Sequence, residues 1–300
     1  MNAAIQFEEL TSCPVCGSAD LHPAAPQQRV MRCRGCGYAF ANPRPTQEEI
    51  VAFYSRGGKY EHWVSNPRAR RRMWTRRLRK LRRLGVSGKV LDVGAGIGEF
   101  LHQVEGLFTE RTGTEVSSEA VRLAHDMYGV KLIEGSFESM EFDPVFDLVT
   151  VFHVLEHVPD PRATVEHCFR ALRPGGWLVV AVPNDMGAKQ RVQSGLGRLG
   201  MRRYATRGPL ALAVPAITLG PEQEEVHLSH FGPGVLRTLL GTAGFVDIVT
   251  SLDPYHAESG ARGAREDVKF ALCAAVERAT GANLYDTIWV QARRPPAEGA

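Results

Sequence analysis

The chain has 300 residues, of which 44% are hydrophobic, and its net charge is +3. These figures are ordinary for a globular protein that buries a sizeable core, and they argue against a uniformly cationic nucleic-acid-binding protein. The apolar runs are far shorter than the ~20 residues that span a bilayer, and the first residues do not resemble a secretory signal. We therefore expect a cytoplasmic protein without a membrane span.

Two C-x-x-C pairs lie near the N-terminus, and sixteen residues separate them. They consist of Cys13, Cys16, Cys33 and Cys36. This spacing is typical of a four-cysteine zinc site, and in a reducing compartment such pairs bind metal rather than form disulfides. Four thiolates close the tetrahedron, so we expect a structural zinc ion in a ribbon over residues 1–45. A pair of redox motifs is the alternative.

Residues 46–85 form a helical connector or cap that is rich in aromatic and basic residues. Ten Arg or Lys and no acid lie within residues 68–83. In this run Trp74, Leu78 and Leu81 share one stripe, which predicts an amphipathic helix packed on the next domain with its basic face in solvent. RNA backbone, acidic lipid head groups or an acidic partner are the alternatives for that face.

From about residue 86, strand-like and helix-like segments alternate, as in an α/β fold with a parallel sheet. We assign this domain to residues 86–293 and expect a flexible tail at 294–300. The predicted strands cover residues 90–93, 111–116, 130–135, 146–154, 177–184 and 285–294. The first predicted helix ends near residue 105, and the others cover 117–129, 161–176 and 262–280. Ser117 or Ser118 is the predicted N-cap of the helix at 117–129.

A glycine loop follows the first strand of this domain. Asp92 precedes the glycines Gly94, Gly96 and Gly98, and Glu99 stands where a dinucleotide fingerprint requires its third glycine. The loop therefore fails that fingerprint. With the later segment "LRPGGWLVVAVPN", it resembles class I S-adenosylmethionine (SAM)-dependent methyltransferases. The resemblance implies a doubly wound, Rossmann-like and mostly parallel seven-stranded sheet. A NAD enzyme or an inactive nucleotide fold is the alternative.

The resemblance also implies a SAM site. Asp92 would offset the positive charges of the cofactor, and Glu115 at the end of the second strand would accept the ribose hydroxyls, as acids do in related nucleotide sites. The remaining candidate cofactor residues follow the second, third and fourth strands. They are Val116, Ser136, Phe137 and Phe152.

The stretch "VFHVLEHVPDP" holds His153, Glu156 and His157 in the H-x-x-E-H order of some zinc proteases. Pro159 and Pro161 exclude the long helix that such a site needs. His157 then either caps a turn with Glu156 orienting it, or one of the two histidines faces the substrate as acid or base. A third interpretation has all three side chains binding a divalent cation.

A second pair of histidines, His227 and His230, lies in "EEVHLSHF". Together with the cysteine knuckles, this segment resembles zinc-ribbon-bearing sugar and natural-product methyltransferases. The resemblance implies that His227 is the catalytic base, that His157 supports the substrate, and that a tyrosine from the connector reaches the site. We select Tyr60 and include His230 among the candidates. In that group Glu usually precedes the base, whereas here Val226 does.

An insertion at residues 184–225 carries six glycines and five arginines, and we expect it to form a lid over the substrate. Its arginines are suited to an anionic group on a small-molecule acceptor; a solvated loop is the alternative. We expect O-methylation of a sugar, glycan or natural-product hydroxyl with a histidine base. An RNA methyltransferase that holds RNA through the ribbon and the basic helix is the main alternative, and a non-catalytic scaffold is the third.

Overall fold

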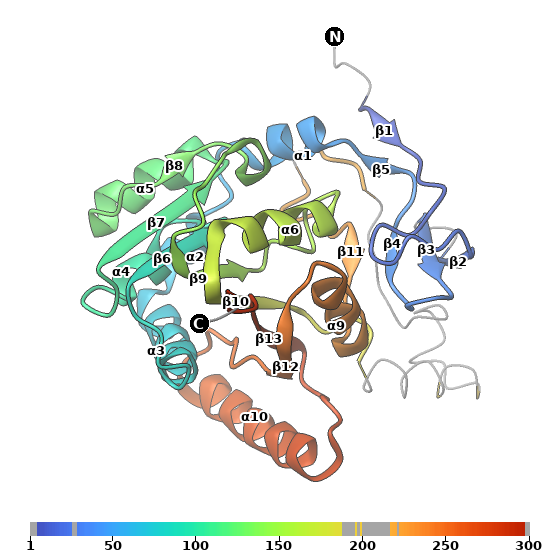
Figure 1. Cartoon of the computed structure of the whole chain (residues 1–300). Helices are drawn as coiled ribbons and strands as arrows, with labels where there is room; N and C mark the ends of the chain where they lie inside the picture. The colour runs from blue at the N-terminus through green and yellow to red at the C-terminus, as the bar shows by residue number, and fades with distance from the viewer. Residues whose placement is uncertain are drawn as a thin grey trace.

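The computed structural model describes residues 5–25, 29–187, 196, 199, 217–220 and 222–297. Most of the expected lid, including all five of its arginines, lies outside this part of the chain. Seven strands form one sheet in the order β12-β13-β10-β9-β6-β7-β8 (Figure 1). Their bounds are Lys89–Val93 (β6), Glu110–Glu115 (β7), Ile133–Glu134 (β8), Phe146–Phe152 (β9), Leu172–Pro183 (β10), Val246–Leu252 (β12) and Thr287–Arg293 (β13).

The mostly parallel, doubly wound sheet predicted from the sequence is confirmed. Only β13 runs antiparallel to its two neighbours within this sheet, and the other paired strands are parallel. The third predicted strand is shorter than expected: of its six residues, Ile133 and Glu134 form β8. At this edge β8 pairs with β7 through Ile133 and Glu134 alone.

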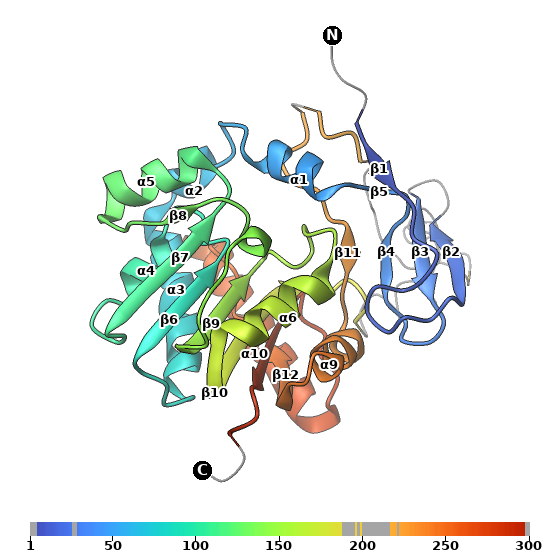
Figure 2. The same ribbon diagram turned by 45° about the horizontal axis from the view of Figure 1, so that its top comes forward.

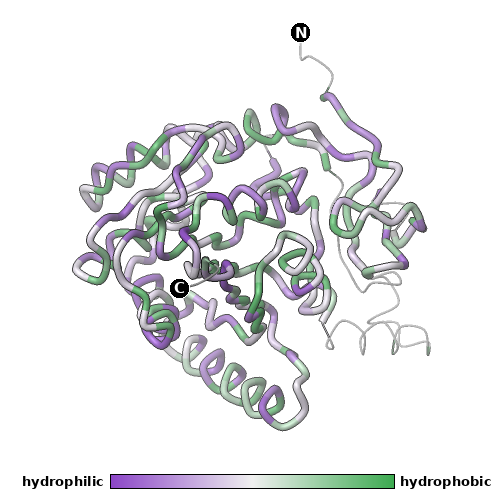
Figure 3. The backbone as a smooth tube through the Cα atoms, viewed as in Figure 1, coloured by the Kyte–Doolittle hydropathy of each residue, from purple (hydrophilic) through white to green (hydrophobic). Residues whose placement is uncertain are grey.

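Five helices accompany the sheet: Glu99–Gln103 (α4), Ser118–Tyr128 (α5), Pro161–Ala171 (α6), Pro233–Thr242 (α9) and Gly260–Thr280 (α10). Ser117 caps α5 and Asp160 caps α6 with side-chain oxygens that accept backbone N–H groups. α6 ends earlier than predicted, and Leu172 is already extended. Pro174 prevents the longer helix that was predicted, because it disfavours the helical conformation at Arg173 and has no N–H to continue the helical hydrogen bonds. In Figure 3, α5 and α10 alternate between hydrophilic and hydrophobic residues, as expected of surface helices.

The cysteine segment forms a ribbon that shares its core with the sheet domain. Its strands β2 (Leu21–Ala25), β3 (Val30–Cys33) and β4 (Ala39–Ala41) form one sheet with β11 (Ser229–His230), which comes from a much later part of the chain (Figure 2). β1 (Phe7–Glu8) pairs with β5 (Arg44–Pro45) beside it. Val15, Tyr38 and Phe40 belong to the same buried cluster as core residues of β9 and β10. The ribbon is therefore packed into the molecule rather than attached by a linker.

The connector consists of three helices, α1 (Gln47–Tyr54), α2 (Glu61–Ser65) and α3 (Pro67–Arg82). As predicted, Trp74, Leu78 and Leu81 are buried on one face of α3. Arg70 and Arg77 are also buried on that face, so the helix is not simply basic toward solvent. Arg70 pairs with Glu99 at 2.7 Å, which ties α3 to the start of α4.

The buried ion pair between Arg77 and Asp253 joins α3 to the segment after β12. Arg77 Nε lies 2.9 Å from Asp253 Oδ1, and the side chains are 2% and 0% exposed. Burial alone would raise the pKa of Asp253, but Arg77 and His153 outweigh it and lower the pKa to about 2. The ionised carboxylate therefore stabilises the fold above its usual pKa near 3.8, and this stabilisation is lost as the pH falls toward 2.

None of the helices in the described ranges is both long and apolar enough to cross a membrane.

Replacing Arg77 by Met should destabilise the fold by about 3–5 kcal/mol, because it leaves the Asp253 carboxylate buried without a partner. Urea unfolding would measure the loss. The double variant Arg77→Met/Asp253→Leu should recover most of it. As a matched control, Arg72→Met breaks a solvent-exposed pair with Asp267 and should cost about 1 kcal/mol or less. Equal losses for Arg72→Met and Arg77→Met would contradict the assignment.

Candidate active site

A cavity of about 340 Å³ opens at the carboxyl ends of β6, β7 and β9. Ligands of open α/β sheets bind at this edge. α1, α2 and α3 contribute its outer wall, and the segment before β11 closes one end. All nine predicted cofactor residues except Gly98 line it. The predicted catalytic residues that line it are His227, His157 and Tyr60, whereas His230 does not.

The glycines of the loop have different reasons to be glycine. At Gly94 an added Cβ would lie 2.4 Å from a methyl carbon of Val154, and at Gly96 it would lie 2.7 Å from the Trp63 ring. Both residues have positive φ, so the loop needs glycine for its conformation and for close approach. Gly98 instead precedes α4 and faces α5, where a Cβ would lie 3.0 Å from the Ala124 side chain. Gly98 also has a positive φ, and it does not line the cavity, so both its conformation and its close packing on α5 favour glycine.

Asp92 is a buried acid at the end of β6. It is 3% exposed and accepts a hydrogen bond from the Thr150 hydroxyl at 2.6 Å. Burial raises the pKa of Asp92 to about 7, although the Thr150 bond acts in the opposite direction. A cation that enters the cavity would favour the ionised form, so this carboxyl is suited to a positively charged ligand.

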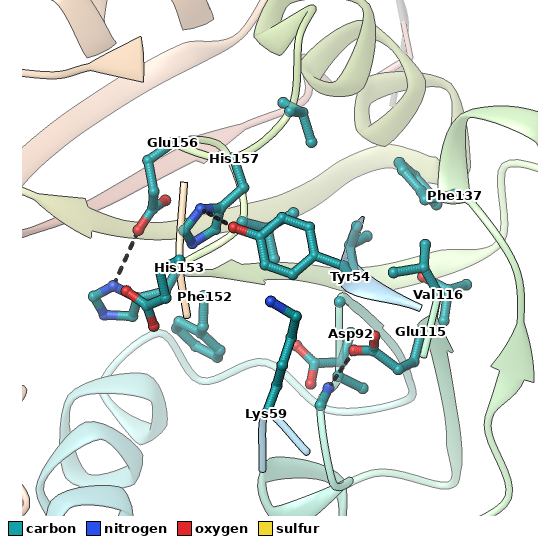
Figure 4. Close-up of a pocket in the computed structure, with 18 of the residues that line it drawn as sticks. Tyr54, Lys59, Asp92, Glu115, Val116, Phe137, Phe152, His153, Glu156 and His157 are labelled. Carbon is teal, nitrogen blue, oxygen red and sulfur yellow. Dashed lines mark hydrogen bonds and ion pairs between the residues drawn. The ribbon is translucent and has the colours of Figure 1, made fainter. Parts of the chain in front are cut away.

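Glu115 orders the loop across from Asp92. Its two carboxylate oxygens accept the amides of Gly96 at 2.8 Å and Ser117 at 3.0 Å (Figure 4). Burial raises its pKa, against these hydrogen bonds. The Tyr60 hydroxyl donates to the same carboxylate at 3.4 Å. The structure therefore places Tyr60 beside the predicted ribose acceptor and not beside a histidine.

The remaining predicted cofactor residues form an apolar wall with one hydroxyl. Val116, Phe137 and Phe152 line the cavity, and Phe152 packs edge-on against Trp74 and Phe100. Ser136 lines it too, but its hydroxyl donates to Glu138 at 2.6 Å.

His157 is held by the connector and by the segment before β11. Its Nδ1 lies 2.8 Å from both the Val226 carbonyl and the Tyr54 hydroxyl (Figure 4). A carbonyl only accepts, so Nδ1 carries the proton and Nε2 keeps a lone pair. Burial lowers the pKa of His157, which keeps the ring neutral near pH 7.

His227 lies directly beside His157. Their ring centres are 5.0 Å apart, and His227 Nε2 is 3.7 Å from a carboxylate oxygen of Glu225. Burial lowers the pKa of His227, but Glu225 and Glu156 outweigh it, so the net change is upward. Val226 directly precedes His227, and the acid that lies against the His227 ring is Glu225, one residue further back.

His153 points away from this pair. Its Nδ1 is 3.3 Å from Glu156 Oε1 and its Nε2 is 2.9 Å from Arg77. Burial opposes ionisation of Glu156, but His153 and His157 outweigh it and lower the pKa of Glu156. The second oxygen of Glu156 is buried and has no hydrogen-bond partner among the described residues. Donor atoms of Glu156, His157 and His227 lie within 4.8 Å of one another. The side chains placed to bind a cation here are therefore Glu156, His157 and His227, whereas the sequence predicted His153 together with Glu156 and His157.

His230 does not belong to the cavity. It is 4% exposed on β11, and its Nδ1 lies 2.9 Å from Asp185. Two residues that are three apart point to opposite faces when both lie in one strand. The sequence alone does not show where β11 begins, so it could not separate His230 from His227.

Tyr54 and Lys59 line the cavity and were not among the predicted site residues. Tyr54 is the connector tyrosine that contacts His157, six residues before the one selected. Lys59 extends into the cavity between Tyr54 and Asp92 (Figure 4), and its ammonium donates to the carbonyls of Gln223 and Glu224. Both lie in the predicted aromatic connector, but nothing in its sequence pattern distinguishes Tyr54 from Tyr60.

The four ribbon cysteines come together as predicted. Cys13 and Cys36 sulfurs are 3.6 Å apart, as are those of Cys16 and Cys33. All four sulfurs lie within 4.8 Å of one another. A tetrahedral zinc ion with Zn–S bonds of ~2.3 Å needs sulfurs about 3.8 Å apart, so the set fits a four-thiolate site.

Comparisons with known proteins agree with this geometry. The family described as "Methyltransferase domain" matches residues 65–257. A protein of Thiobacillus denitrificans named ubiquinone biosynthesis O-methyltransferase is 31% identical over 161 residues, which cover 48% of this chain and 69% of that protein. One of the same name from Psychrobacter arcticus is 29% identical over 51% of this chain and 67% of its own length.

A solved structure from Thermotoga maritima, described as a SAM-dependent methyltransferase and possible histamine N-methyltransferase, covers 82% of this chain and 99% of its own. Its TM-score is 0.51 and its identity is 18%, so it speaks for the fold alone. Gly94, Gly96 and the buried acids Asp92 and Glu115 line one cavity, and they all lie within the matched residues 65–257. This chain belongs to the methyltransferase domain family and is a SAM-dependent methyltransferase.

Proposed function

We propose that the protein transfers the methyl group of SAM to a hydroxyl of a small molecule, such as a sugar, a natural-product intermediate or a quinone precursor. The observation that carries the proposal is the pair His227 and Glu225 beside neutral His157, at the end of the cavity away from Asp92 and Glu115. The names of the curated relatives, which are O-methyltransferases, support it.

The residues divide the work between two halves of the cavity. We define the cofactor half by Asp92, Gly96 and Glu115, and the acceptor half by His157 and His227. Bound SAM supplies an activated methyl group, so the protein mainly has to position the acceptor and remove its proton. His227 takes the hydroxyl proton at the ring nitrogen that does not face Glu225, and the Glu225 carboxylate, 3.7 Å from Nε2, stabilises the resulting imidazolium. His157 has no proton at Nε2, so it can only accept a hydrogen bond there, from a second donor group of the acceptor molecule.

We also propose that the ribbon binds one zinc ion through Cys13, Cys16, Cys33 and Cys36. The sulfur separations support four thiolate ligands with no open position, so the ion is structural.

The RNA alternative has less support. It rests on the ribbon and on the basic face of α3, and Arg70 and Arg77 are buried in ion pairs and do not contribute to that face. Steep loss of RNA binding with salt would be its signature.

Affinity for SAM should rise with pH around 7, because Asp92 must ionise to offset the cofactor's positive charge. We expect binding about tenfold weaker at pH 6 than at pH 8, with proton release on binding. Titration calorimetry in buffers of different ionisation enthalpy measures both effects. Asp92→Asn should bind weakly with little pH dependence; an unchanged pH profile in that variant would contradict the role of Asp92.

His227→Ala should lower kcat by roughly 10²–10⁴ and leave the affinity for S-adenosylhomocysteine unchanged, because the base acts only on the acceptor. Transfer of labelled methyl to a panel of sugar and phenolic hydroxyls provides the assay. The matched control is His125→Ala, an exposed histidine of α5. Because the pKa of His227 is raised, wild-type activity should fall as pH drops through a value above 6.5. Glu225→Gln should move this limb to lower pH. If His227→Ala lowered the affinity for S-adenosylhomocysteine by as large a factor as it lowered kcat, the assignment would be contradicted.

A divalent cation is the second way to activate the hydroxyl. The unpartnered oxygen of Glu156 and its closeness to His157 and His227 favour this candidate.

Titration with Mn²⁺ or Mg²⁺ of protein that keeps its ribbon zinc separates the two. For the base mechanism, turnover persists after EDTA treatment and the ions do not raise it. For the cation mechanism, turnover requires the ion, and Glu156→Gln and His227→Ala each abolish binding of the ion. If turnover of the wild-type protein responds neither to EDTA nor to added ions, the cation mechanism is excluded.

A further inference from the structure

The sheet of the ribbon is completed by a strand that carries the acceptor half of the cavity. β11 pairs antiparallel with β4, and the Ala41 amide extends this pairing by donating to the Leu228 carbonyl at 2.8 Å. His227 is the residue directly before Leu228. Figure 2 shows β11 between the ribbon strands and the rest of the domain. The backbone position of His227 is therefore set from the ribbon side.

A buried side-chain contact reinforces the pairing. The Tyr38 hydroxyl hydrogen-bonds to the Ser229 hydroxyl, and the two side chains are fully buried. The Tyr38 ring lies between Phe40 and Phe231, at centre distances of 5.2 and 5.6 Å. Breaking the bond would leave two hydroxyl groups in an apolar environment without partners, which is unfavourable.

The cysteine knuckle fixes Tyr38 in turn. Tyr38 follows Cys36 by two residues, and its carbonyl accepts the Cys33 amide at 2.9 Å. The pairing of Leu21 with Cys33 and the Arg34 amide, which donates to the Asp20 carbonyl at 3.0 Å, join the two knuckles, and the four thiols lie within 4.8 Å of one another between them. A metal ion held by the four thiolates would fix Cys33 and Cys36, and with them the backbone that leads into Tyr38 and the amide that bonds to its carbonyl.

The other side of the segment is attached to the loop that carries His157. The amides of Leu228 and Ser229 both donate to the Glu156 carbonyl, at 2.7 and 3.1 Å. Leu228 thus bonds to the ribbon through its carbonyl and to the loop after β9 through its amide. The distance between the rings of His157 and His227 depends on both attachments.

We propose that the metal-loaded ribbon is a positioning element for His227, so that metal occupancy controls the acceptor half of the cavity and not the cofactor half. The inference rests on the proposed function of His227. The cofactor half is independent because the hydrogen-bond partners of Asp92 and Glu115 lie on the sheet domain and α2, not in the ribbon. Tyr38 and Ser229 act through His227, so they are positioning residues.

Hydrogen–deuterium exchange tests the coupling without any acceptor. Zinc-loaded and chelator-stripped protein would be compared, both saturated with S-adenosylhomocysteine. We expect faster exchange in peptides covering residues 226–231 of the stripped protein and unchanged exchange over residues 89–98. Unchanged exchange over 226–231, or equal increases in both regions, would overturn the proposal.

Tyr38→Phe and Ser229→Ala test it with the zinc ligands intact. Each should keep one zinc per chain and wild-type affinity for S-adenosylhomocysteine, speed exchange over 226–231, and lower kcat about 10- to 100-fold with little change in the KM for SAM. Tyr285→Phe is the matched control, a buried tyrosine outside the ribbon. Wild-type kcat and exchange in both ribbon variants would overturn the proposal. If no hydroxyl acceptor is methylated by the wild-type protein, the proposed function fails, and the exchange result still decides the coupling.

Discussion

Two amide groups that share one carbonyl oxygen hold the acceptor half together. Leu228 and Ser229 both donate to Glu156, which joins segments about 70 residues apart in the chain. His157 is adjacent to the accepting residue and His227 is adjacent to the first donor. Because both histidines are fixed relative to one backbone oxygen, the geometry between them depends on main-chain hydrogen bonds, which few side-chain changes can alter. The ribbon, the loop after β9 and α1 all meet at this point.

The electrostatics of the cavity follow from burial. Asp92 and Glu115 are buried, and dry surroundings raise the pKa of each. The acid Asp253 is buried as deeply, but Arg77 lies against it and lowers its pKa. Asp253 is therefore paired with a cation inside the protein, whereas the two cavity acids accept hydrogen bonds from a hydroxyl and from backbone amides and have no ion-pair partner among the described residues. Their negative charge is left to be balanced by a positively charged ligand.

Local features of the sequence were sufficient for the cofactor half. Asp92 and the glycine loop lie at the end of β6, and Glu115 lies at the end of β7. One helix connects the two strands, and the regular geometry of such a unit fixes where these residues lie. The cysteine pairs were predictable because their ligand spacing is local too. Tyr54, the burial of Arg77 and the pairing of β11 with β4 depend on contacts between distant segments. No periodicity in the sequence records them, so the acceptor half was only partly predicted, and His230 was misplaced.

The path of the chain through the ribbon has a consequence for biosynthesis. Tyr38 and Ser229, which hold the ribbon to its fourth strand, are 191 residues apart. A ribosome adds residues in order, and domains usually fold from the N-terminus as they emerge. Here the ribbon emerges well before β11 and remains one strand short until that later strand has been made. The exposed edge of β4 must stay unpaired during that interval, which is the interval in which an open strand edge is prone to wrong pairing.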